Sequence, residues 1–307
     1  MVSTASVDDF ARHTTRRIGS GRERVRSVAW NLDGRRLATA GTDKVIRVYL
    51  PDKDPRSATE CRGHTGEVQC VRWSPIHPER FASVSGSAQD KALHFWDLRQ
   101  GHKPVSTVET LGENLNMAWS SDGKTIVIGN RNDKVVWVDV EEQTISRQID
   151  MGKDQTNEFL FSHNDAFLVT GVEGQLRITS FPSHEPIHAI DVGTMPVTVL
   201  DLDPRGRYFV AGCNDTLVSL WETQDWTCVA TSGVHDDPVR MVRFSQDGNF
   251  VASCAADGQV VISAVPGLEK VASFAVPGGN SETLAWHPTK NLLAYVGQET
   301  GIWGAGL

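Results

Sequence analysis

Short stretches of alternating apolar and polar residues recur along the whole chain, and each ends in an anchor, an aromatic or aliphatic residue followed by a polar turn. The seven copies read SVAWNLDG, CVRWSPIH, NMAWSSDG, EFLFSHND, VLDLDPRG, MVRFSQDG and TLAWHPTK. Their anchors are Trp30, Trp73, Trp119, Phe161, Leu202, Phe244 and Trp286. Successive anchors are 43, 46, 42, 41, 42 and 42 residues apart, so one unit of nearly constant length is repeated seven times.

A repeat of this length and pattern is typical of the blades of a β-propeller. Runs rich in β-formers follow the anchors, for example VIRVY at residues 45–49 and VVWVD at 135–139. No helical i, i+3, i+4 pattern spans more than two turns, so we predict an all-β, seven-bladed propeller with about four short strands in each blade. We expect the first strands near residues 25–31, 68–74, 114–120, 157–162, 197–203, 239–245 and 281–287.

Glycine recurs four residues after the anchor, at Gly34, Gly123, Gly206 and Gly248. Three of these glycines follow an aspartate. Asp-Gly tolerates a positive φ, because glycine has no Cβ and aspartate bonds its own backbone. The sequence therefore predicts a two-residue hairpin turn between the first and second strands.

The two ends of the chain are predicted to pair with each other. The third strand of the first unit ends at Tyr49, and the same offset from Trp286 falls at residue 305, so the seventh unit holds three strands. We expect residues 10–18 to supply its fourth strand and so to close the propeller, because this pairing removes two open sheet edges. The expected organisation is a short N-terminal tail at residues 1–9 and one seven-bladed propeller at residues 10–307.

Two dipeptides of the second unit, Gly63-His64 and Trp96-Asp97, are those of the WD40 repeat, with Asp90 between them. The chain thus resembles a WD40 propeller. Further stretches, among them GENLNMAWSSDGKTIVIGN at 112–130 and TLAWHPTKNLLA at 283–294, are similar to the WD40 subunits of the THO complex, part of the TREX mRNA transcription-export assembly.

This resemblance implies a non-catalytic scaffold in the nucleus that binds other proteins and couples transcription to mRNA processing and nuclear export. It implies other THO/TREX subunits as partners, chiefly the large helical-repeat subunit. It implies neither a membrane nor a small-molecule substrate.

The candidate site residues of the second unit are His64, Ser83, Asp90 and Trp96. A histidine, a serine and an aspartate invite comparison with a hydrolase. In WD40 blades, however, these four residue types form a buried hydrogen-bonded chain that holds the outer strands to the inner ones, and the resemblance implies this structural role. The sequence contains no G-x-S-x-G, P-loop or H-E-x-x-H motif. We therefore expect that the protein is not an enzyme and that it has no catalytic residue, cofactor or metal.

Only the second unit has all four members of this chain by sequence. The fifth keeps Asp215 and Trp221 without the histidine, and the sixth has Val234-His235 where Gly-His is expected. We therefore expect the fold to depend mostly on packed aliphatic strands.

Charge is distributed unevenly. The chain carries a net charge of -8, yet residues 11–36 carry +6. The arginines that could contact a partner or RNA are Arg12, Arg16, Arg17, Arg22, Arg24 and Arg26. A basic arm on an acidic body can bind phosphates, but no aromatic residues are interleaved for base stacking. A direct RNA contact is possible, but we expect any RNA contact to be indirect. The alternatives are a contact with an acidic protein and a solvated outer strand and loop.

A second function remains open from the sequence. Residues 96–99 read Trp-Asp-Leu-Arg, the W-D-x-R string of WD40 substrate receptors or adaptors of cullin-RING ubiquitin ligases, in which Arg99 could contact an adaptor. The five cysteines form no C-x-x-C pair, which argues against a disulfide framework and fits a reducing compartment. We expect Cys61 and Cys228, in outer strands, to be more exposed than the other three.

Overall fold

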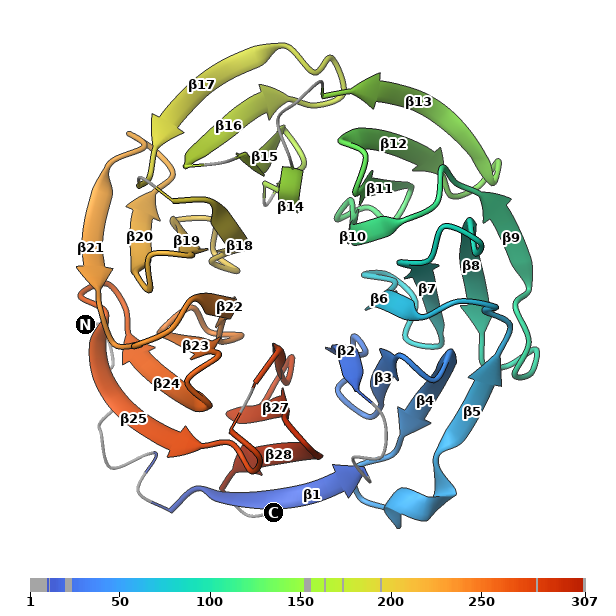
Figure 1. The fold of residues 1–307 in the computed structure, drawn as a ribbon, viewed down its shortest axis with the longest axis horizontal. Coiled ribbons are helices and arrows are strands. Elements are labelled where there is room, and N and C mark those ends of the chain that lie inside the picture. Colours follow the sequence, from blue (N-terminus) through green and yellow to red (C-terminus); the bar gives the residue numbers. More distant parts are fainter. Residues whose placement is uncertain are drawn as a thin grey trace. The chain divides into compact units, whose positions relative to one another are not determined.

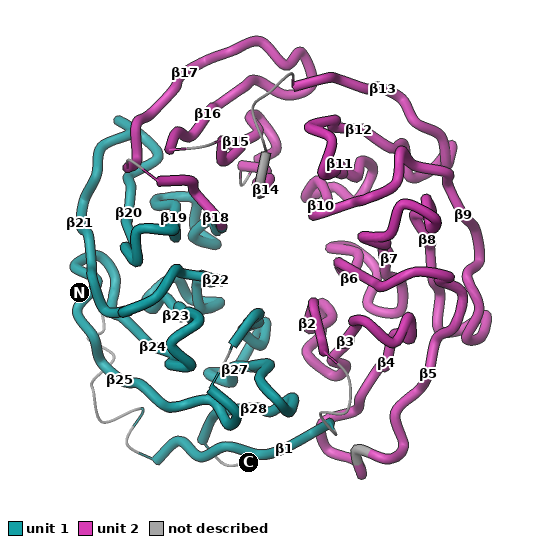
Figure 2. The backbone as a smooth tube through the Cα atoms, in the orientation of Figure 1, with its two compact units in different colours: residues 1–22, 199–307 teal, residues 23–198 magenta. Residues whose placement is uncertain are grey.

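The computed structural model describes residues 10, 12–19, 24–151, 156–162, 164–172, 174–193, 195–279 and 281–305. The chain divides into two compact units, residues 1–22 with 199–307 and residues 23–198 (Figure 2). Seven four-stranded sheets account for the strands, which confirms the predicted all-β fold of seven blades (Figure 1). The expected tail at residues 1–9 lies outside the described residues, and a single domain over 10–307 stays a prediction.

The unit of residues 23–198 holds the first four blades. Blade one consists of β2 (Val25–Trp30), β3 (Leu37–Gly41), β4 (Val45–Tyr49) and β5 (Thr59–Arg62). Blade two consists of β6 (Val68–Trp73), β7 (Arg80–Ser85), β8 (Ala92–Asp97) and β9 (Ser106–Glu109). Blade three consists of β10 (Asn114–Trp119), β11 (Thr125–Asn130), β12 (Lys134–Asp139) and β13 (Thr144–Asp150). Blade four consists of β14 (Thr156–Phe161), β15 (Phe167–Val172), β16 (Gln175–Ser180) and β17 (Pro186–Asp191).

The remaining blades belong to the other unit, apart from the first residues of β18. Blade five consists of β18 (Val197–Leu202), β19 (Tyr208–Cys213), β20 (Val218–Glu222) and β21 (Cys228–Ser232). Blade six consists of β22 (Val239–Phe244), β23 (Phe250–Ala255), β24 (Gln259–Ala264) and β25 (Glu269–Ala275). Blade seven consists of β26 (Thr283–Trp286), β27 (Leu292–Val296), β28 (Thr300–Gly304) and β1 (Thr14–Gly19). One 3-10 helix, η2 (Pro55–Ser57), is the only helix among the described residues.

The first strands lie where the repeat predicted them, within two residues at either end. Five anchors are buried, and Trp119 and Leu202 are half-buried. Packed aliphatic and aromatic side chains join adjacent blades, for example Val71 and Phe81 of blade two with Ile46 of blade one. Burying such side chains is the main stabilising contribution to each sheet.

Indole N–H groups of the anchors tie neighbouring blades together inside each unit. In each case the acceptor is the backbone carbonyl one residue before the anchor of the preceding blade. The bonds run from Trp73 Nε1 to Ala29 O (3.0 Å), from Trp119 Nε1 to Arg72 O (3.3 Å), and from Trp286 Nε1 to Arg243 O (3.0 Å). These bonds therefore fix how the first strands of neighbouring blades are aligned along their length.

The turn after the first strand is wider than predicted. Gly34 has a φ of 71°, as expected of its Asp-Gly pair, but Asn31 N donates to Arg36 O at 3.0 Å with four residues between them. The prediction of a two-residue hairpin turn is therefore wrong. The reason is the side chain of Asn31, which is buried. Its Oδ1 accepts from Arg36 N at 2.9 Å, and its Nδ2 donates to Pro78 O of blade two at 2.9 Å.

A buried polar residue follows the anchor in the other blades as well. These residues are Ser74, Ser120, Ser162, Asp203, Ser245 and His287. In three of the serine turns the hydroxyl accepts a backbone N–H five residues further on. This side chain therefore takes the place of one of the two backbone hydrogen bonds that would join these residues, and it closes the turn.

The N-terminal strand pairs as predicted. Strand β1 runs antiparallel to β28 from Thr14 opposite Gly304 to Gly19 opposite Thr300, so it is the fourth strand of the last blade (Figure 1). Just before it, the buried ring of Phe10 stacks on Trp303 at 5.5 Å. The N-terminal segment is thus held by aromatic packing as well as by backbone pairing.

Replacing Phe10 by alanine should lower the free energy of unfolding by about 3 kcal/mol. The reason is that removing the buried ring leaves a cavity and exposes Trp303, on which the ring stacks. Urea unfolding measures this change. The matched control is Arg12→Ala, two residues away on an exposed side chain, which should stay within about 0.5 kcal/mol of the parent protein. Equal stability of the Phe10→Ala and parent proteins would show that this segment is not part of the folded last blade.

Candidate functional site

The structure brings together His64, Ser83, Asp90 and Trp96. His64 Nδ1 lies 3.0 Å from Asp90 Oδ2, and His64 Nε2 lies 2.7 Å from Ser83 Oγ. Trp96 Nε1 donates to the same Ser83 Oγ at 2.8 Å. All four residues are buried. The four side chains thus form one continuous chain from the turn before β8 to the indole of β8.

The direction of the hydrogen bonds follows from the ionised Asp90 carboxylate, which can only accept, and from the Trp96 indole, which can only donate. His64 Nδ1–H therefore donates to Asp90, which leaves Nε2 to accept the proton of Ser83, whose oxygen accepts from Trp96. This order of aspartate, histidine and serine is that of a hydrolytic triad. Here, however, the His64 side chain is 0% exposed and Ser83 is 0% exposed, so no substrate reaches the hydroxyl.

Asp90 also holds the loop that precedes β6. Its Oδ2 accepts from the backbone N–H groups of Thr65 at 2.7 Å and Gly66 at 2.9 Å, and its Oδ1 accepts from Ala92 N at 3.1 Å. Burial by itself would raise the pKa of the Asp90 carboxyl. The hydrogen bonds from His64 and Gly66 outweigh burial and hold that pKa below its usual range. Asp90 therefore stays ionised and joins a turn, a loop and a side-chain chain.

His64, Asp90 and His94 place three potential metal ligands within 4.8 Å of one another. The nitrogens of His64 are already engaged by Asp90 and Ser83, and His94 Nδ1 lies 2.8 Å from Thr107 Oγ1. The His94 ring also bonds the backbone of Gly63. Since a metal would have to break these bonds, the three residues do not fit a metal centre. Burial, and then the neighbouring His64, lower the pKa of His94 to about 4.

Blade six contains a second chain of this kind that the sequence analysis missed. His235 Nδ1 lies 2.9 Å from Asp257 Oδ2, and His235 Nε2 lies 2.8 Å from Ser253 Oγ. The position of Trp96 is taken by Ser263, which pairs with Val251 as Trp96 pairs with Phe81. His235 and Asp257 are visible in the sequence, but the missing tryptophan hid the pattern.

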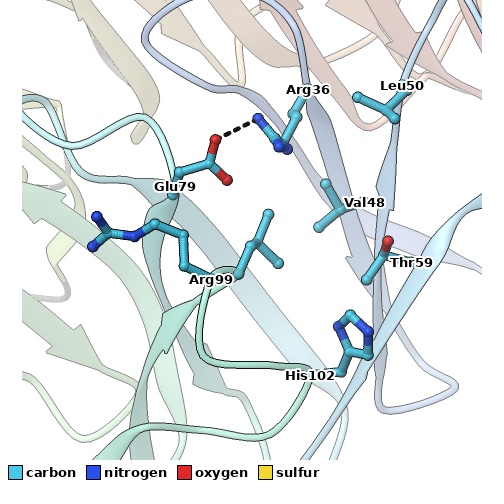
Figure 3. A pocket seen from close by; sticks show the side chains of 8 residues that line it. Arg36, Val48, Leu50, Thr59, Glu79, Arg99 and His102 are labelled. Atoms are coloured by element: carbon cyan, nitrogen blue, oxygen red, sulfur yellow. Dashed lines mark ion pairs between the residues drawn. The ribbon is translucent and has the colours of Figure 1, made fainter.

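A groove of about 350 Å³ lies between blades one and two, at the edge where β4 and β8 end. Its aliphatic lining comes from Val48, Leu50 and Leu98. Across this lining, Arg36 and Glu79 point toward each other and form an ion pair of 2.7 Å between the blades (Figure 3). Leu50 is 36% exposed, so its side chain is accessible from the groove. The groove therefore offers apolar surface with polar ends.

Arg99 of the W-D-x-R string lies at this groove, with its guanidinium turned back to its own blade. Its Nε and Nη2 donate to Asp97 at 3.0 and 2.7 Å, and Arg80 Nε donates to the same carboxylate at 3.0 Å. The hydrogen bond from Arg99 is the main reason that the pKa of the Asp97 carboxyl is lowered. Two guanidinium groups share one buried carboxylate, so this end of the groove carries a surplus positive charge.

The chain has known relatives. The family described as WD domain, G-beta repeat matches residues 13–49, 56–97, 176–222 and 226–262, more than half of the chain. The chain belongs to the WD40-repeat family. THO complex subunit 3 of Arabidopsis thaliana is 32% identical over 91% of this chain and 88% of its own length. The WD repeat-containing protein AAC3 of Dictyostelium discoideum is 28% identical over 93% of this chain and 64% of its own length. Protein HIR1 of Cryptococcus neoformans var. neoformans is 24% identical over 85% of this chain and 28% of its own.

Membership of the WD40-repeat family agrees with the seven four-stranded blades, so the fold is that of a seven-bladed WD40 β-propeller. The matched family is a repeat family and indicates no catalytic class. Among the described residues, no helix is long and apolar enough to cross a membrane.

The basic N-terminal residues are divided between the two compact units. Arg12, Arg16 and Arg17 belong to one unit, Arg24 and Arg26 belong to the other, and Arg22 lies outside the described residues. Arg17 forms an ion pair of 2.8 Å with Glu299, and Arg26 lies 3.8 Å from Glu67. Part of the positive charge of this segment is thus neutralised inside the WD40 fold.

The expectation for the cysteines is half right. Cys228 is exposed, but Cys61 is 1% exposed and burial raises the pKa of its thiol to about 11. Although β5 is an outer strand, the Cys61 side chain points inward and packs with Ile46 of β4, its cross-strand partner.

Replacing Asp90 by alanine should lower the free energy of unfolding by about 1–3 kcal/mol, because the backbone N–H groups of Thr65 and Gly66 and the ring of His64 lose their acceptor. Chemical unfolding measures the loss. Asp257→Ala in blade six is the matched variant, and it should lose less, because Asp257 makes fewer of these bonds. An Asp90→Ala protein as stable as the parent would refute the role of this chain in holding blade two.

Acid should destabilise the protein in two steps. His94 has a folded pKa of about 4, below the usual histidine value of about 6.5, so the unfolded chain binds the extra proton and stability falls as the pH drops from about 6.5 to 4. Asp90 has a folded pKa below the unfolded value, so its contribution is present above about pH 4 and is lost below it. Urea unfolding between pH 3 and 8 should show that His94→Gln flattens only the upper step. An unchanged upper step would contradict this assignment.

Proposed function

We propose that this chain is a non-catalytic scaffold subunit of a THO/TREX complex in the nucleus, coupling transcription to mRNA processing and nuclear export. The observation that carries the proposal is the 32% identity to a THO complex subunit 3 over 88% of that protein's length. A match across nearly all of both chains fits a shared whole-chain role better than a shared repeat alone.

The geometry supports binding rather than catalysis. Two described arrangements have the order of a hydrolytic triad, in blade two and in blade six. Both are closed to substrate, because the side chains of His64 and His235 are 0% exposed and Ser83 and Ser253 are buried. Turns and loops at the blade edges are what remains accessible, and rigid sheets present them in fixed positions. The blade-two residues thus act in this proposal as structural supports of the binding surface.

The partners in this proposal are other THO/TREX subunits, chiefly the large helical-repeat subunit. The groove of Figure 3 has the chemistry for one of their segments: Val48, Leu50 and Leu98 accept an aliphatic side chain, and the surplus charge at Arg99 attracts a neighbouring carboxylate. The arginines of the N-terminal segment add electrostatic attraction to an acidic subunit, and RNA is reached indirectly through the assembly.

A cullin-RING ligase receptor is the alternative function, and it rests on the Trp96–Arg99 string. The comparisons do not favour it, since the relative matched over most of both chains is a THO subunit.

Affinity purification of the tagged full chain from nuclear extract of its own organism tests the proposal. Mass spectrometry should recover the other THO subunits. Leu50→Glu should reduce that recovery at least about fivefold, because a charge is placed on the aliphatic lining of the groove.

The matched control is Val229→Glu, which alters an apolar side chain of similar exposure, 42%, in β21 of the other unit. It should leave the recovery unchanged. Absence of every THO subunit from the wild-type sample would overturn the proposal, and recovery of a ligase adaptor in their place would establish the alternative. An equal loss with both variants would remove the groove as the docking surface.

A further inference from the structure

A second hollow, of about 600 Å³, lies at the opposite edge of the same blades. Because the strands are antiparallel, the β3–β4, β7–β8 and β11–β12 turns and the β5–β6 loop meet at this edge, away from the groove of Figure 3. We call it the basic hollow. Its charged lining consists of Arg26, Lys44, Glu67 and Arg131.

The balance of charge in the basic hollow is positive, with three cations to one carboxylate. Arg26 lies 3.8 Å from Glu67, so these two partly neutralise each other. Lys44 and Arg131 are exposed, and no carboxylate within the described residues forms an ion pair with either. Two cations are therefore available to a ligand, on a chain whose net charge is -8.

Both cations stand on rigid turns. Lys44 has a φ of 68°, and its N–H donates to Gly41 O at 3.3 Å, which closes the β3–β4 turn. Arg131 N donates to Glu113 O at 2.9 Å, and the next residues are held by Asn130 Oδ1, which accepts from Asn132 N at 3.0 Å. Little backbone order has to be gained on binding, which favours a genuine ligand site.

The remaining wall is polar, and its backbone donors are already used. Thr65 N and Gly66 N donate to Asp90, and Gly86 N donates to Glu67 O at 3.1 Å. A ligand would thus be recognised by side chains, the two cations together with Gln69 and Gln89. Asp90 fixes the positions of Thr65 and Gly66 in one wall of this hollow. Through its hydrogen bond with His64, the same carboxylate also stabilises blade two.

We propose that the basic hollow binds a phosphorylated serine or threonine of a partner protein. Cations that line one concave space suit a compact, doubly charged group, and charge-assisted bonds to phosphate are among the stronger polar contacts. No aromatic side chain lines the hollow, so it offers no stacking platform for single-stranded RNA. This binding activity goes beyond the proposed function and does not depend on which assembly the chain joins.

The test uses the full chain and a degenerate peptide library with a fixed central phosphoserine, followed by fluorescence polarisation with the enriched peptides. Phosphorylated peptides should bind, and their unphosphorylated forms should bind at least about tenfold more weakly. The double substitution Lys44→Gln with Arg131→Gln should weaken binding roughly tenfold or more. Glu67→Gln should strengthen it by a few fold, because it removes the carboxylate that repels phosphate.

The matched control is Arg35→Gln with Arg56→Gln, which removes two cations of the same unit whose side chains are 80% and 93% exposed outside the hollow. Its binding should stay within about twofold of the parent protein. The proposal is overturned if no phosphopeptide is enriched, if phosphate makes no difference, or if the control loses as much as the hollow variant. Tighter binding of a labelled oligouridine that follows the same variants would overturn it in favour of RNA phosphates.

Discussion

The alignment of the first strands of neighbouring blades along their length is the constraint on which the rest of this structure depends. An indole N–H of one blade bonds the carbonyl before the anchor of the preceding blade, for example Trp119 Nε1 to Arg72 O at 3.3 Å. Aliphatic packing alone would let two sheets slide, because dispersion contacts have little direction, whereas a hydrogen bond has a fixed length and angle. In the blades joined by these bonds, the edge turns take their positions from strands held in this way.

Where an anchor carries no indole, other groups make the same connection. Blade six has Phe244 as its anchor, and its backbone N–H donates to Asp201 Oδ2 of blade five at 2.7 Å. The preceding Arg243 adds a bond from Nη1 to Leu200 O at 3.0 Å. The physical requirement is thus a directed bond between first strands, and the residue type that meets it varies from blade to blade.

This variation explains what could and could not be predicted from sequence. The repeat, the first strands and the pairing of β1 follow from local pattern and period, and they were correct. The wide turn closed by Asn31, the second hydrogen-bonded chain around His235 and the inward side chain of Cys61 were missed or predicted wrongly. Each depends on a partner in another strand or blade, whose donor or acceptor cannot be read from the residue's own neighbours in sequence. The four residues of blade two were found because the WD40 resemblance supplied their connection.

The position of Asp90 links the stability of blade two to what its edge can bind. A single carboxylate accepts from His64 within the blade and from Thr65 and Gly66, which form a wall of the basic hollow. Antiparallel strands place alternate turns at opposite edges, so blades one and two carry an aliphatic groove at one edge and, together with blade three, a basic hollow at the other. A side chain that fixes the blade therefore fixes two surfaces of different chemistry at once. A partner held at one edge leaves the other edge open, and that geometry suits the scaffold role proposed above.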